Sequence, residues 1–306
     1  MSLIKEDQDR SLLLTWLPAP NASARQRPSP CPGTGSWFLG KGSVRQWLEG
    51  SKSFLWCYGA PGVGKSFLAS HVIDHLLETR TPPDYLVLYF FCDFSSQDEQ
   101  RVIDILHHLL RQVIEQGSTE VLTLLKESCK DPGRLQQAAE VTQLIATAGS
   151  TRQIYLVLDA VDELREPTSL LSHITNLVPS GISLLIMSRD VPHIRKKMTL
   201  ATHLEVDSDP GDLKVYIESR FRDSDFSDEV EEEDKMIGDV ASSSGNLYVH
   251  LTLDSLILRI LMYPGFSLLG YSLTIFLIWP RLIRYERRFV NRMQISIRHS
   301  RQRWIE

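Results

Sequence analysis

Residues 57–67 read CYGAPGVGKSF, and this stretch decides the fold. From Gly59 to Ser66 it has the spacing Gly-x-x-x-x-Gly-Lys-Ser, which is typical of a phosphate-binding loop. The apolar run before it (53–58) predicts a strand, and the amphipathic run after it, from Ser66 to about Glu78, predicts a helix. Because a phosphate-binding loop joins a strand to a helix, the context agrees with the motif.

The residue types in this loop suit a polyphosphate. Glycines let backbone N–H groups approach phosphate oxygens without a Cβ in the way, and a helix N-terminus adds partial positive charge at the same point. Lys65 would place its ammonium on the β- and γ-phosphates, and the Ser66 hydroxyl would ligate Mg²⁺. The predicted nucleotide-binding residues are Gly59, Ala60, Pro61, Gly62, Val63, Gly64, Lys65 and Ser66.

Acidic residues follow a second apolar strand, IYLVL (154–158). Asp159 ends that strand and is predicted, with Ser66, to hold the Mg²⁺ shell. Asp162 and Glu163 lie just beyond it, where a carboxylate could polarise an attacking water as a general base. Arg189 follows the strand SLLIMS (183–188), and ligands of such sheets bind at the carboxyl ends of the strands. Arg189 is therefore predicted to reach the γ-phosphate, so the predicted catalytic residues are Asp162, Glu163 and Arg189.

The remaining pattern alternates strands with helices. Further strands are predicted at 85–91 and 203–206, and helical spacing of apolar residues occurs at 102–114 and from Val121 to Ala148. Strands separated by helices call for a parallel sheet covered on both faces. The predicted fold class is α/β: a three-layer P-loop NTPase domain with a parallel sheet of about five strands, then a small helical lid and an apolar, basic tail.

Several stretches together resemble the NACHT branch of the STAND NTPases, and in particular the nephrocystin-like N-terminal domain of fungal NLR-type proteins. The resemblance covers roughly residues 10–258. The stretches that carry it are GTGSWFL (33–39), LWCYGAPGVGKS (55–66), YFFCDFSSQDEQ (89–100), LVLDAVDEL (156–164), LLIMSRD (184–190), DLKVYIESRF (212–221) and SGNLYVHLTLDSL (244–256).

This resemblance implies a nucleotide-controlled switch with slow, Mg²⁺-dependent hydrolysis of ATP or GTP and self-association in the triphosphate form. It also implies four segments: an N-terminal arm and Pro-rich linker (1–39), the NACHT domain (40–207), a helical lid (208–258) and a tail (259–306). No effector or repeat region is recognisable in the sequence. The alternative is therefore a truncated, non-cycling interaction or membrane-attached remnant, and a metabolic kinase is weaker because no acceptor site is identifiable.

The charge is unevenly distributed. The chain carries a net −5, while residues 259–306 hold nine Arg and two Glu, a net +7 that leaves −12 for the first 258 residues. An acidic body argues against nucleic-acid binding. Residues 260–280 are uncharged and long enough to cross a bilayer, and arginines follow directly, so membrane contact through 260–288 is one expectation. The expected location is cytoplasmic, because the few scattered cysteines suit a reducing compartment.

Overall fold

The computed structural model describes residues 2–17, 27–50, 53–80, 85–96, 100–117, 119–128 and 135–222. The described elements lie in one compact unit that extends to Ser219, and only the last residues of helix α10 lie beyond it. Several predicted features lie outside the described residues: most of the Pro-rich stretch before Arg27, the helix expected after Met236, the apolar segment 260–280 and the basic tail.

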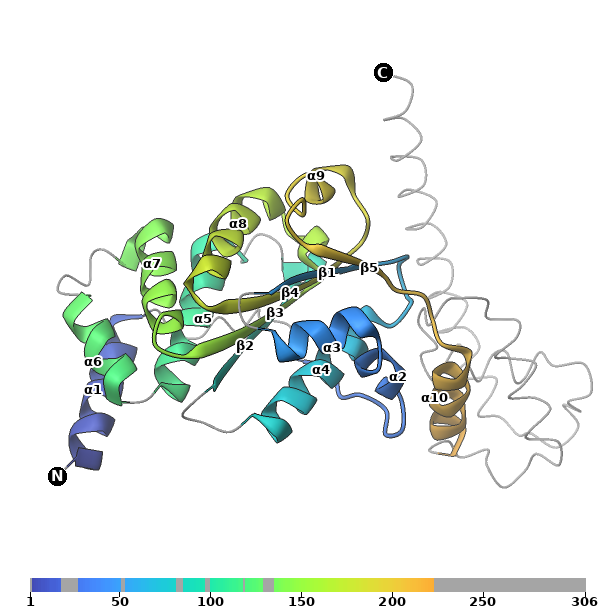
Figure 1. Ribbon diagram of the computed structural model, residues 1–306, viewed down its shortest axis with the longest axis horizontal. Coiled ribbons are helices and arrows are strands. Elements are labelled where there is room, and N and C mark those ends of the chain that lie inside the picture. Colours follow the sequence, from blue (N-terminus) through green and yellow to red (C-terminus); the bar gives the residue numbers. More distant parts are fainter. Residues whose placement is uncertain are drawn as a thin grey trace, which may run out of the picture. The chain divides into compact units, whose positions relative to one another are not determined.

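Five parallel strands form a single sheet, as predicted, and their order is β2-β3-β4-β1-β5 (Figure 1). The strands are β1 (Phe54–Tyr58), β2 (Tyr85–Phe91), β3 (Gln153–Asp159), β4 (Ile182–Ser188) and β5 (Thr202–Glu205). Strands β2, β3 and β4 are almost continuously apolar because helices cover both faces of the sheet, at the edge strand β2 as well as at the central strands β3 and β4. The edge strand β5 is mostly exposed, which explains its weaker apolar pattern.

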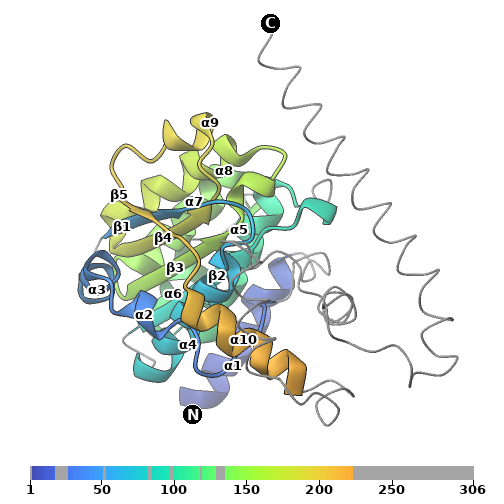
Figure 2. The ribbon, with the colours of Figure 1, turned by 90° about the vertical axis from the view of Figure 1, so that its right-hand side faces the viewer.

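Alternate side chains of each strand enter two separate cores. On β4, Leu184 and Ile186 join the core beneath α5 and α7, whereas Leu185 and Met187 join the core beneath α3 and α4. Figures 1 and 2 show the resulting three layers. The longer described helices are α1 (Ser2–Trp16), α3 (Gly42–Glu49), α4 (Lys65–Thr79), α5 (Val102–Gln116), α6 (Thr119–Ser128), α7 (Ala138–Gly149), α8 (Pro167–Ile174) and α10 (Pro210–Arg222), and the shorter ones are α2 (Ser36–Leu39), α9 (Pro192–Arg195), η1 (Phe94–Ser96), η3 (Val161–Glu163) and η4 (Thr175–Ser180).

The first residues of the chain form helix α1, within the segment expected to be an arm. Leu13 and Leu17 are buried in the core that α5 and α6 share. Arg10 donates hydrogen bonds to the carbonyls of Ile114 and Gly117, at 3.2 Å each, where α5 ends. These carbonyls have no partner within the helix, so the guanidinium caps the C-terminus of α5 and attaches α1 to the domain.

Glutamine side chains of α5 cover the outer edge of strand β2. Gln112 accepts from the Tyr89 N–H (2.9 Å) and donates to the Tyr89 carbonyl (2.8 Å). Gln116 makes the same pair of bonds with Val87, at 3.1 and 2.9 Å. Each side-chain amide thus takes the place of a peptide group on a neighbouring strand. The backbone of this edge strand is hydrogen-bonded although no further strand lies beside it in the described part of the sheet.

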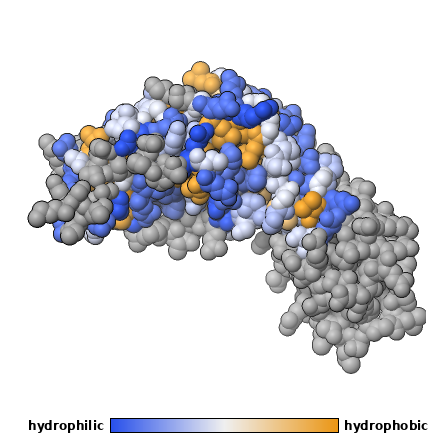
Figure 3. Space-filling view, turned by 60° about the horizontal axis from the view of Figure 1, so that its bottom comes forward, coloured by the Kyte–Doolittle hydropathy of each residue, from blue (hydrophilic) through white to orange (hydrophobic). Residues whose placement is uncertain are grey.

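The face of the described unit that Figure 3 shows is mainly polar. On the face in Figure 3, apolar side chains appear only as small patches between hydrophilic ones. Among the described residues, none of the helices has the length and apolar content needed to cross a membrane.

Candidate functional site

The phosphate-binding loop lies where β1 meets α4, as the motif predicted. A Cβ at Gly59 would come within 2.2 Å of the Val206 carbonyl oxygen, so the loop can pass the end of β5 only with glycine at this position. Gly62 and Gly64 have φ of +80° and +90°, in the left-handed region that glycine adopts freely. Lys65, the first residue of α4, donates from Nζ to the carbonyls of Gly59 (2.8 Å) and Ala60 (2.7 Å). The ammonium therefore lies over the loop.

Strand pairing brings the second half of the site to the same edge. Tyr58 of β1 pairs with Ser188 of β4, and β3 pairs with β4 in parallel, so the loop, Asp159 and Arg189 all follow carboxyl ends of adjacent strands. The Ser66 hydroxyl donates to Asp159 Oδ2 over 2.5 Å, and Asp159 is 1% exposed. The sequence had placed both residues around one Mg²⁺, and the structure brings them into contact.

A hydroxyl and a carboxylate oxygen side by side suit a hard cation such as Mg²⁺, which proteins usually hold through one or two oxygen ligands while phosphates and waters complete the octahedron. Within the described residues, His, Cys, Asp and Glu form no group of three or more that could hold a metal ion by itself. Ser66 and Asp159 therefore fit a metal that arrives with a phosphate better than an all-protein metal site.

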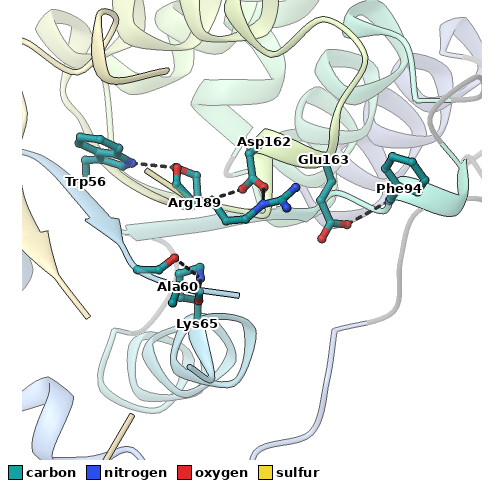
Figure 4. Close-up of polar contacts among 9 residues, drawn as sticks. Trp56, Ala60, Lys65, Phe94, Asp162, Glu163 and Arg189 are labelled. Atoms are coloured by element: carbon teal, nitrogen blue, oxygen red, sulfur yellow. Dashed lines mark hydrogen bonds and ion pairs between the residues drawn. The ribbon is translucent and has the colours of Figure 1, made fainter. Parts of the chain in front are cut away.

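The turn after β3 aims the other two carboxylates. Ala160 has φ 54° and ψ 37°, the single non-glycine residue with positive φ in the described chain. That conformation costs an L-residue about 1–2 kcal/mol and is found disproportionately at functional sites. The turn presents Asp162 to Arg189, and Glu163 to the backbone N–H of Phe94, which donates to Glu163 Oε2 over 3.0 Å (Figure 4).

Asp162 accepts two hydrogen bonds from Arg189. The backbone N–H donates to Oδ1 over 2.8 Å and Nε donates to Oδ2 over 2.5 Å. Ser188 fixes the backbone here, because its hydroxyl accepts from the Trp56 indole N–H and donates to the Arg189 carbonyl, at 2.9 Å each (Figure 4). The structure thus brings the three predicted catalytic residues, Asp162, Glu163 and Arg189, to one place, with Asp162 engaged by Arg189.

The electrostatics at Lys65 reflect this crowding. Burial lowers the pKa of Lys65 below its ordinary value, and the carboxylates of Asp162 and Asp159 oppose that shift. The guanidinium of Arg189 lowers the pKa further and Glu163 raises it. An ammonium, a guanidinium and three carboxylates therefore act on one another at the mouth of the loop, where an incoming phosphate would find two cationic side chains.

A hollow adjoins the loop on the side of α10. It encloses about 450 Å³ of empty space, part of it open to solvent. Its walls come from the loop and α4 (Val63, Gly64, Phe67, Leu68, His71), from α2 and the segment before it (Cys31, Thr34, Gly35, Trp37) and from α10 (Asp212, Tyr216). The rings of Phe67 and Tyr216 are 6.3 Å apart. An apolar, aromatic hollow next to a phosphate loop has the chemical character of a small-molecule site.

Asp212 joins two walls of this hollow. Its Oδ2 accepts from the Gly35 backbone N–H (2.8 Å) and from the Trp37 indole N–H (2.7 Å). The sequence analysis assigned no role to Trp37, Asp212 or the hollow. Both residues lie in stretches that carry the family resemblance, GTGSWFL (33–39) and DLKVYIESRF (212–221). Nothing in a linear motif, however, indicates that the two stretches meet.

Solved structures that align with this chain include an ORC1 protein and a replication initiation protein. The Aeropyrum pernix ORC1 protein in complex with DNA aligns at 16% identity and a TM-score of 0.46, over 77% of this chain and 60% of that one. Domain III of the Thermotoga maritima replication initiation protein DnaA aligns at 14% identity and a TM-score of 0.40, over 71% of this chain and 80% of that one.

Sequence comparison is more specific. The vegetative incompatibility protein HET-E-1 of Podospora anserina is 28% identical over 177 residues, which make up 54% of this chain and 13% of HET-E-1. This chain thus spans a small part of that longer protein. The family model described as nephrocystin 3, N-terminal, matches residues 33–189, slightly more than half of the chain and the segment that carries the loop, Asp159, Asp162, Glu163 and Arg189. The chain therefore belongs to the nephrocystin 3 N-terminal family, the NACHT-type group that its motifs indicated.

Proposed function

We propose that this chain binds a nucleoside triphosphate, ATP or GTP, with Mg²⁺ and acts as a conformational switch with weak hydrolysis that controls self-association. The observation that carries the proposal is the convergence of Lys65, the Ser66–Asp159 pair and Arg189 on the mouth of one glycine-rich loop. Isolated motifs occur by chance, whereas this grouping supplies cationic, metal-ligating and acidic groups at one point.

In this proposal the residues Gly59 to Ser66 hold the phosphates through backbone N–H groups and the Lys65 ammonium. Ser66 and Asp159 hold the Mg²⁺, which when bound would neutralise negative charge on the phosphate oxygens. Glu163 and Asp162 are the candidates for orienting an attacking water, and Arg189 for contacting the γ-phosphate. The hollow lined by Trp37, Phe67 and Tyr216 is the nearest described space for the base.

The switch itself would involve α10, because Asp212 and Tyr216 of this helix line the hollow. A ligand that fills the hollow contacts α10 and the domain at once, so occupancy can bias the position of the helix. The kinship with HET-E-1, whose name refers to vegetative incompatibility, supports a role in self-association and signalling. A cytoplasmic location, with membrane contact through residues 260–288, completes the proposal.

The deciding experiment uses the full 306-residue chain and quantifies the nucleotide that co-purifies with it. Lys65→Ala is the test variant, and Lys196→Ala, an exposed lysine of the α9 region, is the matched control. We expect near-stoichiometric nucleotide in the parent and in Lys196→Ala, and none in Lys65→Ala. A folded parent that is empty and fails to bind added Mg-ATP or Mg-GTP would refute the proposal and favour a non-cycling remnant.

Self-association needs a second readout. We expect light scattering to report a larger assembly with a non-hydrolysable triphosphate than with the diphosphate, and no such difference in Lys65→Ala. An assembly state that is the same with triphosphate and diphosphate would refute the switch but would leave nucleotide binding as a function.

A further inference from the structure

The pairing of Asp162 with Arg189 bears on how the site distinguishes a triphosphate from a diphosphate. Both oxygens of the Asp162 carboxylate accept hydrogen bonds from this one arginine. The Asp162 side chain is 5% exposed, whereas that of Arg189 is 48% exposed. The carboxylate is thus enclosed beneath a guanidinium that itself borders solvent.

A general base needs an oxygen that is free to take a proton from water. Asp162 has each oxygen engaged by a donor of Arg189, so neither oxygen is open to an attacking water in this arrangement. Glu163 has a different partner, because its Oε2 accepts from the backbone N–H of Phe94. The geometry therefore separates two carboxylates that the sequence treats alike.

Arg189 can change partners without moving its backbone. Its carbonyl is held by Ser188, whose hydroxyl is held in turn by Trp56, a fully buried residue of β1. Its N–H holds Asp162 Oδ1 independently of the side chain. Within the described part of the chain, no hydrogen bond uses the two Nη groups of Arg189, so they retain donors for a second anion.

The second anion would meet Arg189 from the side of the loop. β1 and β4 pair in parallel, so the loop and Arg189 follow neighbouring carboxyl ends, and the guanidinium also lowers the pKa of Lys65. Figure 4 shows Arg189 between Asp162 and Glu163, on the side of the site that faces Lys65. A phosphate bound at Lys65 would thus lie within the field of a guanidinium already paired with Asp162.

We propose that Asp162 is a positioning residue that holds Arg189 in the resting state and competes with the γ-phosphate for it, so that Asp162 sets the preference of the site for triphosphate over diphosphate. This inference rests on the proposed nucleotide binding. A diphosphate lacks the group that competes, so Arg189 stays on Asp162. A triphosphate draws the guanidinium toward its γ-phosphate through the Nη groups and so weakens the Nε bond to Asp162, and part of its binding free energy is spent on that exchange.

The test compares Asp162→Asn with the parent in the full chain. Asparagine keeps the size and one carbonyl acceptor but loses the charge that holds the guanidinium. We expect the affinity for a non-hydrolysable Mg-triphosphate to rise roughly tenfold, because the released bond involves a charged pair, while the Mg-diphosphate affinity changes less than about twofold. Calorimetric titration with both nucleotides gives the ratio of triphosphate to diphosphate affinity, and it needs no measurement of hydrolysis.

Two further variants make the comparison specific. Asp190→Asn removes the carboxylate of the neighbouring exposed pair with Arg195 and should leave the ratio unchanged. Arg189→Ala should abolish the triphosphate preference. Adding Asp162→Asn to Arg189→Ala should change the affinity ratio no further, because the carboxylate acts only through the arginine. The Arg189→Ala variant also tests the proposal if Asp162→Asn fails to fold. A preference for triphosphate over diphosphate that survives in Arg189→Ala refutes the proposal.

The outcomes separate the inference from the function on which it rests. An unchanged ratio in Asp162→Asn together with slower hydrolysis would identify Asp162 as a water-orienting residue and overturn the inference alone. An equal loss of both affinities would mean that Asp162 only maintains the shape of the site, which also overturns it. A parent that binds neither nucleotide would refute the proposed function and the inference together.

Discussion

Asp212, in the first turn of α10, and Trp37, in α2, are joined by a 2.7 Å hydrogen bond from the indole N–H to the carboxylate, and the same carboxylate oxygen accepts the N–H of Gly35. These residues are 175 positions apart in the sequence. Their contact closes one side of the hollow beside the phosphate loop. It is therefore a physical link between α10 and the NTPase core.

The first prediction concerns this link. Asp212→Ala removes the acceptor of two hydrogen bonds, each of which contributes about 1.5–3 kcal/mol when the acceptor is charged. We expect release of a fluorescent nucleotide to accelerate by at least roughly tenfold, equivalent to about 1.4 kcal/mol. Lys214→Ala, which breaks an exposed pair on the same helix, is the control. Equal release rates in the parent and Asp212→Ala would mean that α10 does not restrict the hollow.

The second prediction concerns the edge of the sheet. Replacing Gln112 and Gln116 together with alanine removes four hydrogen bonds to the backbone of β2, at a net cost of about 1 kcal/mol each. We expect a lower urea midpoint and also concentration-dependent light scattering, because an uncovered strand edge can pair with another chain. Gln143→Ala, on the exposed surface of α7, should do neither. Lower stability without scattering would restrict the glutamines to a purely intramolecular role.

The third prediction is a pH dependence. Burial and the nearby Arg111 lower the pKa of His108 in the folded protein, and the His108 ring packs edge-on against Phe90 at 5.3 Å. The unfolded chain, with an ordinary histidine pKa of about 6.5, then binds more protons as the pH falls below that value. Stability contributed by the neutral imidazole is therefore present above about pH 6.5 and is lost as the pH falls through it.

The measurement compares urea midpoints at about pH 7.5 and 5.5, on either side of the ordinary histidine pKa. We expect the parent to lose more stability on acidification than His108→Gln. His193→Gln, at an exposed position of α9, should behave like the parent. An identical loss in the parent and His108→Gln would assign the acid sensitivity to other groups.

The fourth prediction concerns α1. Arg10→Ala removes the guanidinium that caps α5 through Ile114 and Gly117. We expect a loss of about 1–2 kcal/mol in unfolding free energy and faster amide exchange along α1, because charged groups that bind helix-terminal carbonyls have effects of this size. Arg45→Ala, at an exposed position of α3, is the control. If α1 exchanges at the parental rate, its apolar contacts alone hold it.

Much of the fold followed from local patterns. All five strands were predicted because each is a short apolar run, and even β5 kept enough of that pattern. The grouping of Lys65, Asp159 and Arg189 also followed, since parallel strands place their carboxyl ends at one edge. Helix α1 was missed because only its last third is apolar, and its charged residues hide the two leucines that enter the core.

The engagement of Asp162 could not have been predicted from spacing. Asp162 and Glu163 are adjacent and chemically similar, and their different partners depend on the left-handed turn at Ala160. The pairing of Trp37 with Asp212 was equally hidden, because it depends on where the chain returns after β5. Local sequence determines elements and loops, whereas partners across long sequence separations depend on packing.

The glutamines that cover β2 also determine on which side the sheet can pair with a strand from another copy. Among the described strands, β5 has only β1 beside it, whereas the opposite border is occupied by side-chain amides. A template with one border blocked can accept a partner strand on one side only. Copies joined through β5 would stop at two, because side-chain amides occupy the β2 border of each sheet, and a fibre built by repeated strand addition would need both borders.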